Sequence, residues 1–202
     1  TQGGGMVSLG TLGGVLSTGH AVSADGSVVV GGARNPADQT RAFRWENGTM
    51  TDLGVMGGLD STATAVSGDG TIVVGVAPNL RGESQPFRWT QATDLQNLNT
   101  LYASLLSGGS SLTNTRAISP DGRYIVGAGY NAATGRTEAY LLDTGAPRRG
   151  DVDRSGCVDD ADLLRVLFEF GGRGYRNEDL NWDGTIDDAD LLTVLFHFGS
   201  GC

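Results

Sequence analysis

The sequence contains no lysine, only two cysteines and five prolines, and all 14 basic residues are arginine. No run of 18 apolar residues occurs, so we expect no membrane-spanning helix. The net charge is −9 and there is no basic stripe, which leaves no electrostatic surface for nucleic acid. Two cysteines and two distant histidines, His20 and His197, do not make a zinc site.

Catalytic motifs are missing as well. The chain has no Gly-x-Ser-x-Gly elbow, no phosphate-binding loop and no histidine cluster. Asp25, Asp69 and Asp121 each precede a glycine, which makes them turn residues rather than a convergent acid pair. We therefore expect a protein that is not an enzyme.

Glycine is frequent, with 33 residues, and a threefold repeat spans residues 9–143. The most similar segment of the repeat is Ala-Val-Ser-x-Asp-Gly at 21–26 and 65–70, which corresponds to Ala-Ile-Ser-Pro-Asp-Gly at 117–122. A β-branched run ending in glycine follows each copy, so each Asp-Gly predicts a hairpin. Four short strands per unit of 44 to 52 residues predict an all-β, propeller-like domain.

A tripeptide recurs after each hairpin, as Arg-Ala-Phe at 41–43, Gln-Pro-Phe at 85–87 and Glu-Ala-Tyr at 138–140. With these positions, the pattern resembles the HAF repeat, an extracellular bacterial repeat named for its His-Ala-Phe tripeptide. The resemblance implies a secreted β-repeat domain and brings no activity with it.

The third unit stops near Asp143 without its fourth strand, whereas residues 5–10 resemble the fourth strand of the first unit at 49–54. The N-terminal segment has two possible places. It could fold back within its own chain, or it could complete the third unit of a neighbouring copy, a head-to-tail contact that propagates into a ring or filament. The strand residues of this predicted interface are Met6, Val7, Ser8 and Leu9.

A twelve-residue pattern of oxygen-bearing side chains occurs twice, at 151–162 and 179–190. An EF-hand-type calcium loop takes its ligands from positions 1, 3, 5, 7 (main chain), 9 and 12, with glycine at position 6. Both copies meet these requirements, so we predict two Ca²⁺ sites. The predicted ligands are Asp151, Asp153, Ser155, Cys157, Asp159 and Asp162 in the first loop, and Asp179, Asn181, Asp183, Thr185, Asp187 and Asp190 in the second.

No helix-forming segment precedes the first loop, and a similar helix follows each loop. This loop-then-helix repeat resembles the type I dockerin module, a calcium-dependent docking domain of secreted bacterial proteins. In dockerins, loop positions 10 and 11 help to select the cohesin partner. Here these positions are the same in both copies, which would suit binding in two orientations: Asp160, Ala161, Asp188 and Ala189.

The two helices are more apolar than a packed surface helix requires. Either the excess forms a partner surface, or it packs on the β-domain of the same chain. The residues concerned are Leu164, Phe168, Leu192 and Phe196.

Cys157 lies in the first loop and Cys202 is the last residue of the sequence, so a disulfide would clasp residues 151–202. In the chain-entropy model such a bridge contributes on the order of 4 kcal/mol. A disulfide and millimolar calcium both indicate an extracellular protein. The chain starts without a charged and apolar leader, which is consistent with a removed signal peptide.

The sequence therefore predicts a multidomain protein with an all-β repeat domain (1–143), a linker (144–150) and a small α calcium-binding domain (151–202). Residues 151–202 carry 12 acids and four arginines, so −8 of the net charge lies there. We expect an extracellular structural protein that assembles with other copies, such as a filament or surface-layer subunit. The alternative is a cell-surface binding module that recruits a cohesin-type protein or a glycan, for which Trp45 and Trp89 are candidates although such repeated positions are more often core.

Overall fold

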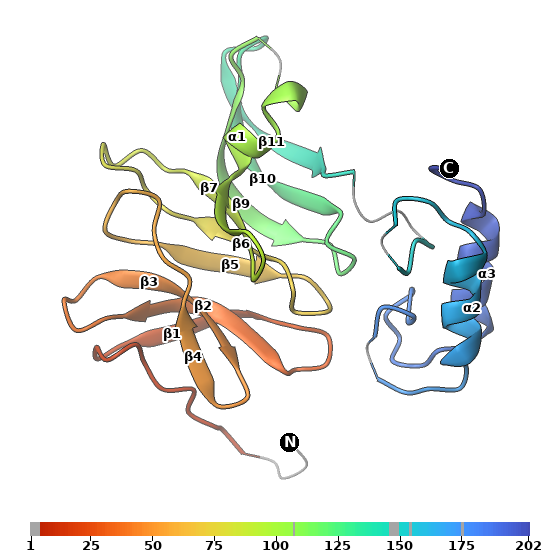
Figure 1. The fold of residues 1–202 in the computed structure, drawn as a ribbon. Coiled ribbons are helices and arrows are strands. Elements are labelled where there is room, and N and C mark those ends of the chain that lie inside the picture. The colour runs from red at the N-terminus through yellow and green to blue at the C-terminus, as the bar shows by residue number, and fades with distance from the viewer. Residues whose placement is uncertain (1–4, 107, 146–149, 154, 175) are drawn as a thin grey trace.

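A computed structural model describes residues 5–202 except 107, 146–149, 154 and 175. Within these residues the chain is mostly β, with three antiparallel sheets that lie one after another in a row (Figure 1). The first two sheets have four strands each, in sequence order, and the third has three, in the order β11-β10-β9. The strands are β1 (Ser17–Val22), β2 (Val28–Arg34), β3 (Thr40–Glu46), β4 (Thr49–Asp52), β5 (Thr62–Val66), β6 (Val73–Val76), β7 (Pro86–Thr90), β8 (Asp94–Asn97), β9 (Ser111–Ile118), β10 (Tyr124–Asn131) and β11 (Arg136–Asp143).

The Asp-Gly hairpins predicted from the repeat are confirmed, and one side-chain network closes each of them. In the second unit, Ser67 Oγ donates to Asp69 Oδ1 at 2.6 Å and accepts the Ile72 N–H at 3.0 Å. Gly70 takes the left-handed conformation that the turn needs, with φ of 72°. Ser23 and Ser119 make the same contacts in the other two units. The shared turn is thus why all three units begin alike.

The glycine that ends each β-branched run is required by a close backbone approach. A Cβ at Gly31 would lie 2.0 Å from the Thr18 carbonyl oxygen, and one at Gly75 would lie 2.2 Å from that of Thr62. In both sheets the register shifts by one residue nearby, as at a β-bulge. The copies of the repeat therefore share this close approach of glycine to a carbonyl oxygen, as well as the turn.

Two apolar clusters join the three sheets. Val28 and Val30 of the first sheet share one buried cluster with Val73 and Phe87 of the second. The second and third sheets meet in another, which holds Val74, Leu98, Ile125 and Leu142. Leu98 belongs to α1 (Leu98–Leu101), a single turn that is followed by the 3₁₀ turn η1 (Ala103–Leu105) between β8 and β9. The β-domain is therefore held together by face-to-face burial between successive sheets.

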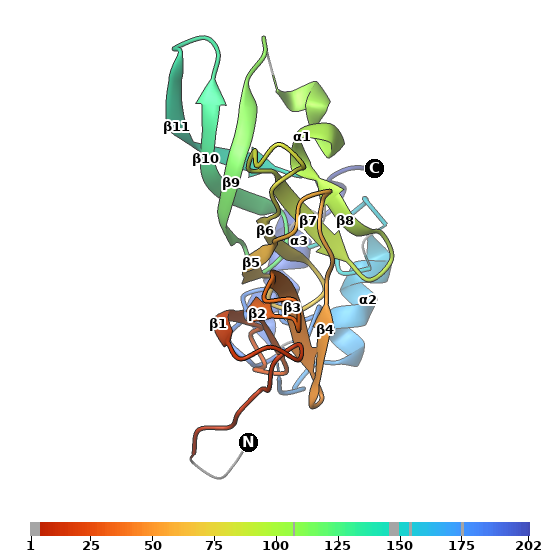
Figure 2. The ribbon, with the colours of Figure 1, turned by 90° about the vertical axis from the view of Figure 1, so that its left-hand side faces the viewer.

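The N-terminal segment does not pair within its own chain in the part of the structure described. Residues 6–10 belong to no strand, Met6 is fully exposed and Val7 is 62% exposed. Figures 1 and 2 place this segment at the β1–β4 end of the row and β11 at the opposite end. Of the two places predicted for Met6–Leu9, folding back onto the third unit is therefore wrong, because the row is open and its ends are far apart.

Residues 151–202 form a small helical unit around α2 (Asp160–Phe168) and α3 (Asp188–His197). Its core is five buried aliphatic residues from the loops and both helices, namely Val152, Val158, Val166, Ile186 and Val194. The predicted disulfide between Cys157 and Cys202 is present, with 4.8 Å between the two Cα atoms. Such bonds are typical of proteins outside the reducing cytosol.

Neither these helices nor any other helix in the described part of the chain has the length and apolar character needed to cross a bilayer.

We predict that Ser67→Ala destabilises the β-domain by about 1–3 kcal/mol, because it leaves the buried Ile72 N–H without its side-chain acceptor. Urea unfolding followed by circular dichroism measures the change. Ser27→Ala is the matched control: its hydroxyl also donates to a turn aspartate, but the Ser27 N–H keeps its own bond to Asp25, so the loss should stay below about 0.5 kcal/mol. Equal losses in the two variants would contradict the role assigned to the turn.

Candidate metal centre

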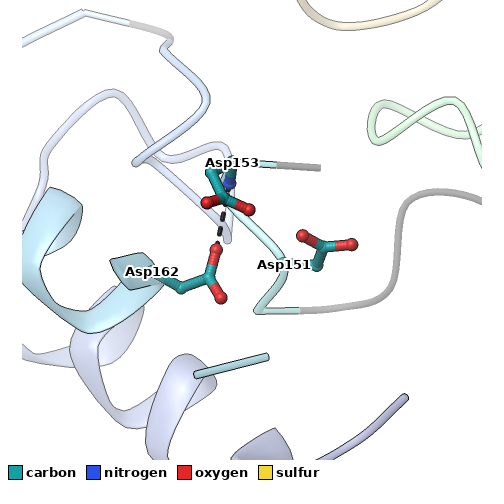
Figure 3. A group of neighbouring side chains, drawn as sticks. All are labelled: Asp151, Asp153 and Asp162. Atoms are coloured by element: carbon teal, nitrogen blue, oxygen red, sulfur yellow. Dashed lines mark hydrogen bonds between the residues drawn. The ribbon is translucent and has the colours of Figure 1, made fainter. Parts of the chain in front are cut away.

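Three carboxylates of the first loop lie together at the start of α2 (Figure 3). One oxygen each of Asp151, Asp153 and Asp162 lies within 4.8 Å of the others. Asp162 is fully buried and Asp151 is 4% exposed. The cluster therefore holds acidic groups where water has little access.

Backbone N–H groups orient these carboxylates. Asp162 Oδ2 accepts the Asp159 N–H at 2.9 Å and its Oδ1 accepts the Asp153 N–H at 3.0 Å. Asp151 Oδ2 accepts the N–H of Gly156, a residue in the left-handed conformation, at 2.9 Å. The sharp turn at the sixth position is thus what brings the first and twelfth residues of the loop together.

The other oxygen of Asp151 is buried and has no hydrogen-bond partner among the described residues. Burial raises the pKa of this carboxyl, and the charges of Asp162 and Asp153 raise it further. An ionised oxygen held this way is costly unless a cation neutralises it. The donor set, the burial and this unpaired oxygen fit a hard divalent cation of the Ca²⁺ type.

The second loop repeats the same design. Asp179 and Asp190 are fully buried, and burial raises the pKa of Asp179 in the same way. Asp179 Oδ2 accepts the Gly184 N–H at 2.8 Å, and Asp190 Oδ2 accepts the Asp187 N–H at 2.9 Å. Asn181 donates to Asp183 at 2.9 Å, so these two predicted ligands are also neighbours. The backbone bonds of the two loops are therefore alike, but among the described residues three carboxylates gather in the first loop alone, and Asp179 Oδ1 accepts the Asp183 N–H at 3.1 Å where Asp151 Oδ1 has no partner.

The remaining predicted ligands have partners within the protein. Ser155 Oγ donates to the Cys157 carbonyl at 3.1 Å. Asp159 and Asp187 are the N-caps of α2 and α3, where each forms a reciprocal capping box with the aspartate three residues later. Thr185 forms an isolated bridge with Arg173. A direct ligand role for these residues stays a prediction.

The apolar face of the two helices is exposed. Phe168 and Phe196 are 83% and 81% exposed, and Leu164 and Leu192 are each about half exposed. In Figure 1 the loops lie between this pair of helices and the β-domain. The alternative in which this face packs on the β-domain is therefore wrong. Asp160, Ala161, Asp188 and Ala189 are exposed as well, so the predicted partner surface is accessible.

The outer edge of β11 is open: within the described residues this strand pairs with β10 alone. Leu141, two residues before the end of the strand, is 68% exposed. At its end, Arg123 holds the Asp143 carboxylate through two bonds of 2.7 and 2.8 Å and lowers the pKa of Asp143 to about 2. The edge is thus a fixed row of unpaired backbone groups.

One contact was not predicted from the sequence. Trp182, at the fourth position of the second loop, packs against Gly68 of the β-domain. The signal that could have found it is Gly68 itself, which stands where the other two repeats have Ala24 and Pro120.

No family model matches the chain, and no curated protein matches it. Among solved structures, TolB from Acinetobacter baumannii is 18% identical, with a TM-score of 0.43, over 61% of this chain and 28% of that one. A putative TolB from Agrobacterium tumefaciens is 14% identical, with a TM-score of 0.44, over 63% of this chain and 42% of that one. The chain spans less than half of either protein, and no function is assigned from them.

We predict opposite effects of Asp151→Asn with and without calcium. In a chelator the variant should melt at a higher temperature than the wild type, because one buried charge is removed from the cluster. At calcium 100-fold above Kd, each filled loop should stabilise the wild type by about 2.7 kcal/mol, and the variant should lose most of the first loop's share. Thermal melts followed by circular dichroism measure both.

Asp160→Asn is the control for this test, since Asp160 is exposed and lies outside the cluster. It should leave both melting temperatures nearly unchanged. If Asp151→Asn lowered the melting temperature in chelator and gained as much from calcium as the wild type, the first loop would not be a cation site.

Proposed function

We propose that this chain is an extracellular, non-catalytic structural protein whose copies associate by strand exchange, with a calcium-folded, dockerin-like unit making further protein contacts. The observation that carries the proposal is a pair of complementary features in one chain. β11 has an open edge, and Met6–Leu9 is an unpaired segment that resembles β4. Addition of a strand to an exposed sheet edge is a recurrent mode of protein association.

The repeat defines the register of this exchange. Gly31, Gly75 and Gly127 pair with Phe43, Phe87 and Tyr140 respectively, so Leu141 of β11 is equivalent to Arg44 of β3. Arg44 pairs with Thr51 of β4, and Thr51 is equivalent to Val7. Val7 should therefore lie opposite Leu141, and Met6 opposite Leu142.

Burial of apolar side chains favours this pairing. Met6, Val7 and Leu141 are the exposed large apolar residues of the two partners, and strand addition would place Val7 beside Leu141 on one face and so reduce the exposure of both to water. Because Figures 1 and 2 place the two partners at opposite ends of the row, the strand of one copy would reach the edge of another. Such a head-to-tail contact leaves a free strand and a free edge on every pair, and it continues into a filament or ring.

The second candidate is a binding module that recruits a cohesin-like protein. The exposed aromatic pair Phe168 and Phe196 favours it, because aromatic residues are enriched at the centres of protein interfaces. The loop doublets at positions 10 and 11 are exposed beside each helix, where a partner would meet them. For a glycan the support is weaker, since Trp89 packs against the core of the first two sheets.

We predict that a mixture of two single variants, Val7→Cys and Leu141→Cys, forms a disulfide-linked heterodimer on mild oxidation. Residues directly opposite in an antiparallel pair have Cβ atoms about 4.5–5.5 Å apart, close enough for a strained or slightly adjusted disulfide. Non-reducing gel electrophoresis measures the yield. Because each cysteine is on a different molecule, pairing within one chain cannot produce this product.

Val7→Cys mixed with Ala139→Cys is the matched control. Ala139 is also exposed on β11 and points to the same face as Leu141, but it lies two residues out of register. Its yield should be at least about tenfold lower, because the two Cβ atoms would be about 7–8 Å apart. Equal yields, or a chain that stays monomeric at every concentration in calcium, would refute strand exchange in this register.

A further inference from the structure

The three repeats meet at one end of the β-domain through backbone hydrogen bonds. The Ala24 N–H donates to the Gly68 carbonyl at 2.9 Å, and the Gly68 N–H donates to the Pro120 carbonyl at 2.8 Å. These residues are the fourth members of the three Ser-turn hexapeptides. Together with Val22, Val66 and Ile118 they line a hollow of about 330 Å³, and the last member of its wall is Trp182.

The position of Trp182 explains why residue 68 is glycine, although the turn itself does not require glycine there. Gly68 has no positive φ, and Ala24 and Pro120 occupy the equivalent places, so the backbone would accept a side chain. A Cβ at Gly68 would, however, lie 2.8–2.9 Å from three atoms of the Trp182 ring. Real Cβ atoms do not approach so closely, and the missing side chain is therefore what lets the indole lie flat against the repeat.

The second loop determines where this indole points. Trp182 has a φ of 60°, a left-handed conformation that is unfavourable for a residue other than glycine. Its neighbours hold it there: the Asp183 N–H donates to Asp179 at 3.1 Å and to Asn181 at 3.0 Å. Asp179, Asn181 and Asp183 are the first, third and fifth positions of the loop, so the groups that shape Trp182 are those predicted to bind the cation.

We infer that the second loop is an interdomain docking surface, with Trp182 as its anchor in the three-repeat hollow, and that a bound cation stabilises the docked state. The occupant of the hollow is thus a segment of the same chain. Its dependence on calcium rests on the function proposed above. Docking would fix the helical unit relative to the β-domain, since relative motion of two domains is the default unless a contact between them prevents it.

Limited trypsin digestion of the full chain tests this inference, because a helical unit that undocks and opens more often is cleaved faster at its own arginines, such as Arg165 and Arg173. In calcium, Trp182→Ala and Gly68→Ala should each raise the initial cleavage rate about tenfold. The double variant should be no faster than either one, since both changes break the same contact. Leu80→Ala, which removes an exposed apolar side chain elsewhere on the β-domain, should cleave at the wild-type rate.

Fluorescence supplies a second readout. Adding calcium to the wild type should shift the tryptophan emission to shorter wavelength, and Gly68→Ala should reduce that shift although Gly68 is not in the loop. Wild-type cleavage rates in both single variants, together with an undiminished calcium-induced emission shift in Gly68→Ala, would overturn the docking surface. If calcium still raised the melting temperature while docking was disproved, the proposed calcium binding would remain supported and only the docking surface would be rejected. A tenfold rate difference that was the same in chelator would overturn the role of the cation.

Discussion

Unpaired backbone along one strand edge is the constraint on which the arrangement of this protein depends. In the first two sheets a fourth strand, β4 or β8, pairs with the third strand. In the third sheet, within the described residues, no fourth strand pairs with β11. N–H and C=O groups at such an edge bond to water or to another strand, and an exposed apolar side chain on the edge favours the second. Leu141 makes this edge apolar near its end, where the Arg123–Asp143 ion pair holds the strand.

Burial of charge is the corresponding constraint in residues 151–202. Four aspartates at the first and twelfth loop positions are almost completely buried, and the acids of this unit outnumber its arginines by eight. A 52-residue unit has a small core, here five aliphatic residues and a disulfide, so it has little stability with which to offset the repulsion. A divalent cation bound in each loop would convert the repulsion into attraction, and for this reason we expect metal binding and folding to be linked.

Features that depend on residues close together in the sequence could be predicted from it, whereas the placement of one sheet or unit relative to another could not. The Asp-Gly hairpins, the missing twelfth strand, the two loops and the Cys157–Cys202 bond all follow from residues close in the repeat or from pairing the only two cysteines. The place of Met6–Leu9 depends on whether three sheets close into a ring or stay in a row, which is decided by packing between sheets. Exposure of Phe168 and Phe196 depends on which side of the helical unit faces the β-domain, and the contact of Trp182 depends on the same choice.

The side of the helical unit that faces the β-domain also affects how copies could assemble. If the loops face the β-domain, the helix faces necessarily point outward, and the two kinds of contact use different sides of the molecule. Strand exchange would then run along the row of sheets, while Phe168 and Phe196 would project sideways at a fixed angle to it. A freely tethered unit would present the same residues in every direction and could not add a defined lateral contact. An anchor between the domains is therefore what would turn a linear array of copies into an ordered surface.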